Sequence, residues 1–101
     1  QQGVGSSKSY ITETYINRTS GYRIWSDGYC EQWGRVTGNG NNGLATNLLK
    51  AYANTNYTVY VTNASNSRNN VEVAVGITSS SQIKIFAYQQ LVLWGTSGYI
   101  A

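Results

Sequence analysis

Residues 20–34 read SGYRIWSDGYCEQWG, and two aromatic-rich runs flank Asp27-Gly28 in this stretch. An Asp-Gly pair between alternating runs is a strong hairpin signal, because a two-residue type I′ turn needs positive φ at both central positions. With these two residues as the turn, Trp25 faces Cys30 on the opposite strand, and cross-strand partners share a face of the sheet. One predicted face carries Tyr22, Ile24, Tyr29 and Trp33 together with Glu31, and the other carries Arg23, Trp25, Cys30, Gln32 and Gly34.

The first of these faces is the more apolar, so we expect it to face the core. The second then looks outward, with Trp25 and Cys30 beside Arg23 and Gln32. A fully solvated Trp at the end of a hairpin is unfavourable, so this face is expected to be covered by another strand, another chain or a ligand.

Short runs of alternating residues recur along the rest of the chain at intervals of about ten residues, with turn signals between them. We expect extended structure over 10–18 and strands over 57–63, 71–77, 83–89 and 91–101, separated by polar loops that include 38–43 and 64–70. This spacing predicts an all-β fold, an antiparallel sandwich or barrel.

One segment fits two structures. Residues 44–53, LATNLLKAYA, are predicted to be mainly extended, followed by a turn at 54–56. A short helix is the alternative, since periodicity alone does not separate the two states in a short apolar run. Residues 1–9 are rich in Gly and Ser and are expected to be a linker.

The composition indicates one domain with an aromatic, weakly charged surface. The chain has 101 residues, with nine Tyr and three Trp but one Phe, and 11% of its residues are charged. Such a surface suits a secreted or virion-exposed protein. The seven Lys and Arg residues are scattered, whereas nucleic-acid binding needs a clustered basic footprint. No run approaches the ~20 apolar residues of a membrane helix, so we expect neither nucleic acid nor membrane insertion.

The residues of common catalytic and metal sites are scarce. Cys30 is the only cysteine and the chain has no His, so neither a cysteine metal site nor a Cys-His nucleophile can be built. Asp27 and Glu31 are the only acidic residues close in sequence, and Asp27 already has a role in the turn. We therefore expect no enzyme activity, no catalytic residue, no metal and no cofactor.

A binding or structural domain remains. Trp and Tyr side chains can stack on sugar rings, and amide and carboxylate side chains hydrogen-bond to hydroxyls. Binding residues are often found on polar loops that a rigid sheet supports. The candidate ligand-binding residues are Trp25, Arg23, Gln32, Tyr29, Asn41, Asn42 and Arg68.

The chain also resembles a known family. The hairpin contains a W-x-D-G-x-x-x-Q-x-G pattern, and the later residues Leu48, Lys50, Tyr52, Asn56, Tyr57, Thr58, Val59, Trp94 and Gly98-Tyr99-Ile100 follow in order. Over about residues 20–101 this pattern resembles the C-terminal tip domains of bacteriophage tail fibres.

The resemblance implies a small β-sandwich over 19–101 at the distal end of a homotrimeric fibre in the virion. A connecting segment over 1–18, or the outward hairpin face, would then pack at the interface between subunits. The implied role is non-enzymatic adhesion to lipopolysaccharide, capsule or an outer-membrane protein of the host. The alternative is a structural or trimerisation module of the fibre that binds no receptor.

Overall fold

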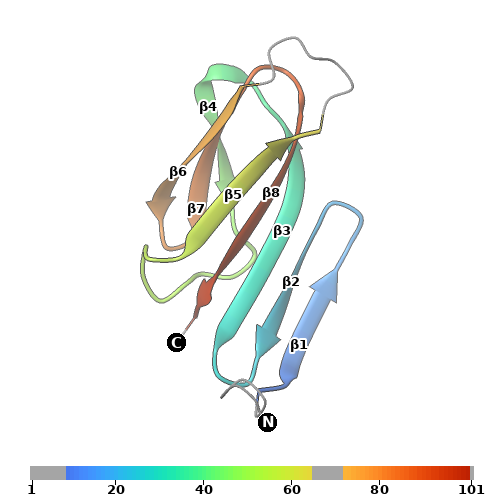
Figure 1. Ribbon diagram of the computed structural model, residues 1–101, viewed down its shortest axis with the longest axis vertical. Coiled ribbons are helices and arrows are strands. Elements are labelled where there is room, and N and C mark those ends of the chain that lie inside the picture. The colour runs from blue at the N-terminus through green and yellow to red at the C-terminus, as the bar shows by residue number, and fades with distance from the viewer. Residues whose placement is uncertain (1–8, 65–71, 101) are drawn as a thin grey trace.

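Eight antiparallel strands form the fold in the computed structural model, which describes residues 9–64 and 72–100. The strands are β1 (Ile11–Ile16), β2 (Ser20–Trp25), β3 (Tyr29–Thr37), β4 (Gly40–Asn47), β5 (Thr58–Asn63), β6 (Val73–Ser79), β7 (Gln82–Ala87) and β8 (Leu91–Tyr99). They make a five-stranded sheet in the order β1-β2-β3-β8-β5 and a three-stranded sheet in the order β4-β7-β6 (Figure 1). The predicted all-β antiparallel sandwich is confirmed, and the described ranges contain no helix.

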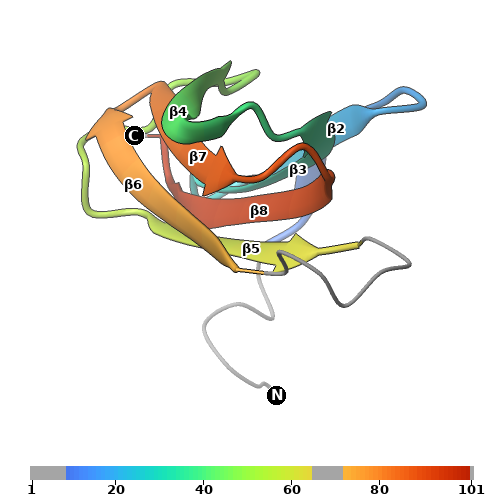
Figure 2. The ribbon, with the colours of Figure 1, turned by 90° about the horizontal axis from the view of Figure 1, so that it is seen from above.

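The core lies between the two sheets, which face each other as layers (Figure 2). The β7 residues Ile83 and Ile85 and the β8 residue Val92 have no exposed surface. Each such side chain contributes about 1.5–3 kcal/mol through burial of apolar area. Alternation along β7 places Ile83, Ile85 and Ala87 on one buried face, as the sequence predicts.

The hairpin between β2 and β3 differs from the prediction by one residue. Three residues separate the strands, and the N–H of Gly28 donates to the carbonyl of Trp25 at 2.9 Å, with Gly28 at φ 90°. A turn that ends in a left-handed glycine is the usual three-residue hairpin loop. Ile24 therefore pairs with Cys30, and not with Glu31. A slip of one residue exchanges the two faces of a strand, so the predicted faces of β3 are reversed.

The five-stranded sheet begins before residue 19. Strand β1 lies in the segment expected to connect the domain to the fibre, and it pairs with β2 from Ile11 to Ile16. The backbone N–H of Ser26 donates to Tyr10 at 2.7 Å, which holds the start of β1 against the hairpin turn. Residues 1–8 lie outside the described part of the chain.

The expected loop over 38–43 is largely part of a strand. Strand β4 begins at Gly40, which pairs with Ala87, while Leu44 pairs with Ile85. Between these two pairs β4 advances by four residues while β7 advances by two. The extra residues of β4 form an irregular stretch in which Gly40 and Gly43 have positive φ of 100° and 82°. Glycine-rich sequence here marks an irregular strand and not a free loop.

Residues 48–57 close one side of the sandwich without regular structure. Leu48 and Tyr52 donate backbone hydrogen bonds to the β6–β7 turn at Ser81 and Ser80, each at 2.8 Å, and Ala53 donates to Tyr99 at 2.9 Å. The extended half of the predicted 44–53 segment therefore ends at Asn47, and the helix alternative does not occur.

Candidate functional site

The outer face of the five-stranded sheet carries the most prominent group of aromatic side chains directed away from the core. The strand register aligns the side chains in rows across β2, β3, β8 and β5. One row contains Gly21, Trp33, Gly95 and Tyr60, and the next contains Arg23, Glu31, Ser97 and Thr58. Tyr29 and Tyr99 continue this face at the hairpin end. We call this set of residues, with Trp25, the outer face.

Two aromatic rings of the outer face lie flat over glycines of neighbouring strands. A Cβ added to Gly95 would lie 2.4 Å from the Tyr60 ring, and one added to Gly21 would lie 2.6 Å from the Trp33 ring. The absence of a side chain at each glycine lets the ring rest on the backbone of the next strand. Tyr60 keeps 58% of its surface exposed in this position. One face of the ring is thus supported by the sheet while the side chain remains largely solvated.

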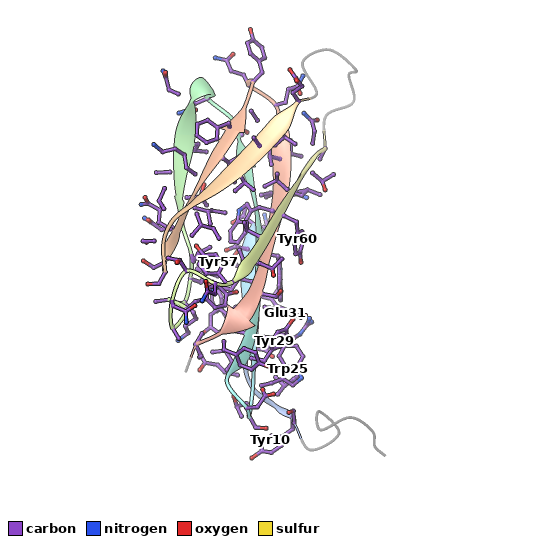
Figure 3. The ribbon with its side chains drawn as sticks, turned by 60° about the vertical axis from the view of Figure 1, so that its left-hand side comes forward. Tyr10, Trp25, Tyr29, Glu31, Tyr57 and Tyr60 are labelled. Carbon is purple, nitrogen blue, oxygen red and sulfur yellow. The ribbon has the colours of Figure 1, made fainter. Side chains whose placement is uncertain are left out.

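Three more aromatic rings gather at the hairpin end. The ring centroids of Trp25 and Tyr29 are 5.6 Å apart, and those of Tyr29 and Tyr99 are 5.5 Å apart in an edge-on arrangement. With Ser9 and Asp27 these rings line a hollow of about 320 Å³. Figure 3 shows Trp25 and Tyr29 on the same side of the sheet as Glu31. The hollow offers apolar walls and a carboxylate at one place.

A polar row separates the two aromatic groups. The Arg23 guanidinium lies 5.2 Å from the centroid of the Trp33 ring, a cation–π contact that holds the charge above the sheet. No described residue forms an ion pair or a hydrogen bond with the Glu31 carboxylate. A guanidinium and a free carboxylate beside flat aromatic rings can hydrogen-bond to the hydroxyls of a polar ring compound stacked on those rings.

Gln32 and Cys30 do not belong to this surface. Gln32 is 1% exposed, and its side-chain amide donates to the Lys50 carbonyl at 2.8 Å and accepts from the Lys50 N–H at 2.9 Å. Cys30 is fully buried, and burial raises the pKa of its thiol to about 11. The sequence-based assignment of both residues to the outward face was wrong, because the hairpin loop has three residues.

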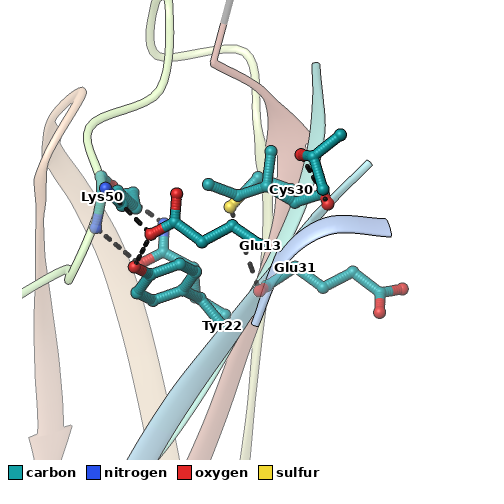
Figure 4. Close-up of polar contacts among 8 residues, drawn as sticks. Glu13, Tyr22, Cys30, Glu31 and Lys50 are labelled. Atoms are coloured by element: carbon teal, nitrogen blue, oxygen red, sulfur yellow. Dashed lines mark hydrogen bonds and ion pairs between the residues drawn. The ribbon is translucent and has the colours of Figure 1, made fainter. Parts of the chain in front are cut away.

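A polar network on the inner side of β1 and β2 supports the hairpin (Figure 4). The Tyr22 hydroxyl donates to the Glu13 carboxylate, which also lies 3.7 Å from the Lys50 ammonium. The hydrogen bond from Tyr22 lowers the pKa of Glu13, and the same bond raises the pKa of Tyr22 to about 12. In Figure 4 the Glu31 carboxylate points away from this network, so Glu13 on β1 and Glu31 on β3 face opposite sides of the sheet.

The predicted ligand-binding residues separate into four groups, one of which is the buried Gln32 described above. Trp25, Arg23 and Tyr29 come together on the outer face. Asn42 is exposed on the irregular part of β4, in the other sheet, and so stands apart from them. The side chain of Asn41 and the whole of Arg68 lie outside the described residues.

The sequence did not identify Trp33, Tyr60 and Tyr99 as members of this surface. Trp33 was expected in the core because of the register error, and Tyr60 was not assigned to either side. For Trp33 and Tyr60 the common signal is a glycine opposite the aromatic ring, Gly21 and Gly95 respectively, whereas Tyr99 lies opposite Tyr29. That signal can be read only when the order of the strands is known.

In the part of the chain that the structure describes, no three His, Cys, Asp or Glu side chains gather where they could hold a metal ion. Among the same residues no helix is long and apolar enough to cross a membrane.

Comparison with known proteins identifies a relation to phage-like tail fibres. Two solved structures share the fold: the R2 pyocin fibre of P. aeruginosa, comprising its C-terminal part, and an N-truncated R2-type pyocin tail fibre. The first has a TM-score of 0.61 at 18% identity, over 89% of this chain and 25% of the fibre chain. The second has a TM-score of 0.60 at 17% identity, over 89% and 37% of the two chains. The chain thus spans well under half the length of either fibre.

The search of curated proteins gave no match. Residues 23–101 match the family described as tail fiber protein gp53-like, C-terminal. This match begins at Arg23, in the middle of β2, and includes the remainder of the chain. The chain therefore belongs to the gp53-like family of phage tail-fibre C-terminal domains.

Proposed function

We propose that this domain is the receptor-binding tip of a tail fibre and attaches the virion to a glycan on the bacterial surface. The observation that carries the proposal is the outer face, where Tyr60 and Trp33 lie on glycines beside the polar groups of Arg23 and Glu31. Flat, supported aromatic rings flanked by hydrogen-bonding groups suit the apolar faces and hydroxyls of sugar rings. The domain acts by binding, as a homotrimer, and performs no chemistry.

Aromatic exposure supports a contact role over a purely structural one. Tyr60 stays 58% exposed, so the folding of the domain uses only part of the apolar surface of its side chain. The core is filled by other residues, including Ile83, Ile85 and Val92. The side chain of Tyr60 is therefore best explained by something outside the domain. Lipopolysaccharide and capsule both present such sugars, whereas an outer-membrane protein is the competing receptor.

The test is binding of the fluorescently labelled chain to a panel of bacterial strains. We expect it to stain some strains and not others, and periodate oxidation of the surface sugars should abolish staining while protease treatment leaves it. The variant Tyr60→Ala should lose at least about tenfold in affinity, since stacking of one aromatic side chain is worth about 1.4 kcal/mol or more.

Tyr88→Ala is the matched control. Tyr88 is exposed to a similar degree, 55%, but lies after β7 and not on the outer face. Equal loss of staining in the two variants would refute the assignment of the outer face. A chain that stains no strain would favour the structural module, and staining that protease removes would replace the glycan by a protein receptor.

A further inference from the structure

We propose that strand β1 is the contact through which one copy of this chain binds the next, an inference that rests on the homotrimer proposed above. All six residues of β1 are exposed, which is true of no other strand whose burial is fully described. The remaining described strands each bury or half-bury at least alternate side chains. β1 therefore belongs to the sheet by hydrogen bonding, but none of its residues is buried on either side.

Three of the six exposed side chains of β1 are large and apolar. Ile11 is 48% exposed, Tyr15 45% and Ile16 58%, and the adjoining Tyr10 is 66% exposed. With about 150–250 Å² for each large side chain, these four leave roughly 400 Å² of apolar surface in contact with water. A standard interface buries about 800 Å² on each partner and is a little over half apolar. The patch is thus large enough to be the apolar part of one such interface.

The backbone of β1 is also open. β1 pairs with β2 and with no other described strand, so its second edge has unpaired N–H and C=O groups. Natural edge strands are usually guarded by a lysine, a proline or an inward charge. β1 has neither lysine nor proline. It does carry one inward charge, Glu13, but this carboxylate is already paired with the Lys50 ammonium at 3.7 Å and with the Tyr22 hydroxyl, so the charge that it sets against an incoming strand is partly neutralised. A shift of register lies between Ile11 and Glu13, which leaves Glu13–Ile16 regular and able to pair.

The two sheets leave the cover of β1 incomplete. The second sheet has three strands and the first has five, so the inner side of β1 extends past the sandwich. Tyr15 stacks on Tyr22 there, with ring centroids 5.8 Å apart, yet it remains nearly half exposed. Ile16 lies on the opposite side, paired with Gly21. An occupant must therefore reach the edge and both faces of the strand, which a small ligand does not do.

A second copy of the chain meets these requirements. β1 lies at the margin of the five-stranded sheet, at the lower end of the domain in Figure 1, and the domain is 46 Å long and 26 Å or less across. Rotation about an axis parallel to the strands brings the whole of β1 beside the neighbouring copy. Such a head-to-tail contact closes into a ring when the rotation closes. Ile16 and Tyr15 would be covered in the ring, while Tyr60, at the opposite edge of the sheet on β5, would remain available to receptor.

The test is the mass of the chain in solution, by light scattering and sedimentation over a range of concentrations. Wild type should be a trimer. Ile16→Lys should raise the dissociation constant by about 100-fold or more, because a buried, unpaired ammonium costs several kcal/mol. Tyr88→Lys, on a side chain exposed to the same degree but distant from β1, should remain a trimer.

Each outcome decides a separate claim. A trimeric wild type with a trimeric Ile16→Lys variant overturns the β1 contact and leaves the homotrimer intact. A monomeric wild type overturns both, while staining of cells by that monomer would still support receptor binding. If Ile16→Lys does not fold, hydrogen exchange of wild type decides the question: the β1 amides should be protected in the trimer and exchange rapidly on dilution to monomer.

Discussion

Gln32 is the residue for which sequence and structure make the most different predictions. From the sequence, Gln32 lies on the outward face and contacts a ligand. In the structure it is 1% exposed, and its amide pairs with both backbone polar groups of Lys50, at 2.8 and 2.9 Å. The two bonds tie the 48–57 segment to β3. The variant Gln32→Ala separates the two accounts.

The expected loss follows from the contacts. Each hydrogen bond contributes a net ~0.5–1.5 kcal/mol, and loss of about one buried methylene adds ~0.8 kcal/mol. Gln32→Ala should therefore reduce the free energy of unfolding by about 3 kcal/mol, a large part of the 5–15 kcal/mol typical of a domain. For a domain of this size the midpoint of thermal unfolding should fall by roughly 12–24 °C.

Thermal unfolding followed by circular dichroism, at one fixed protein concentration, measures this effect, since association shifts apparent stability. Gln89→Ala, which removes an exposed glutamine, is the control and should change the midpoint by less than about 2–3 °C. The folded Gln32→Ala variant should stain cells as wild type does. An unchanged midpoint together with lost staining would refute the reasoning and restore the two-residue hairpin.

Three further predictions concern the core. Gly34→Ala places a Cβ 2.6 Å from the buried Trp94 ring and should destabilise the domain by ~1–3 kcal/mol in urea unfolding. The control is Gly76→Ala, whose Cβ would have nothing within 4 Å and which should be neutral or slightly stabilising. Equal effects of the two variants would contradict the packing described. The buried Cys30 thiol, with a pKa of about 11, should not react with thiol reagents at pH 8 until the chain unfolds, and rapid reaction would mean that Cys30 is exposed. Burial also raises the pKa of Tyr52 to about 12, so Tyr52 and Cys30 both lose their protons at lower pH in the unfolded chain than in the folded one. The free energy of unfolding should therefore be complete below pH 9 and fall between pH 9 and 12. A urea midpoint that stays constant over that range would count against the prediction.

The strands of the C-terminal half were predictable because their alternation has one interpretation. Along IKIFA, Ile83, Ile85 and Ala87 share a face, and no nearby turn can shift them relative to the core. The β2 part of the hairpin was also predicted correctly, since Tyr22 and Ile24 are buried. Both cases rest on the period of two within a single strand, which needs no knowledge of a partner strand.

The β3 part failed because an Asp-Gly pair is compatible with two loop lengths. A two-residue turn and a three-residue loop with a left-handed glycine both place Gly28 at positive φ. They differ by one residue in register, which decides whether Gln32 or Trp33 faces the core. The local sequence favours neither, and the choice is made by distant contacts such as those of Gln32 with Lys50.

The outer face could not be predicted for a related reason, since it is built from pairs that are distant in sequence. Gly95 receives Tyr60 and Gly21 receives Trp33 only because β5, β8, β3 and β2 lie side by side in that order. The same device occurs inside the domain, where Trp94 lies over Gly34 and is 5% exposed. Inside, a ring on a glycine fills space that the core requires to be filled. Outside, Tyr60 covers Gly95 with one face of its ring and remains 58% exposed, so much of its surface is free to make the receptor contact proposed above.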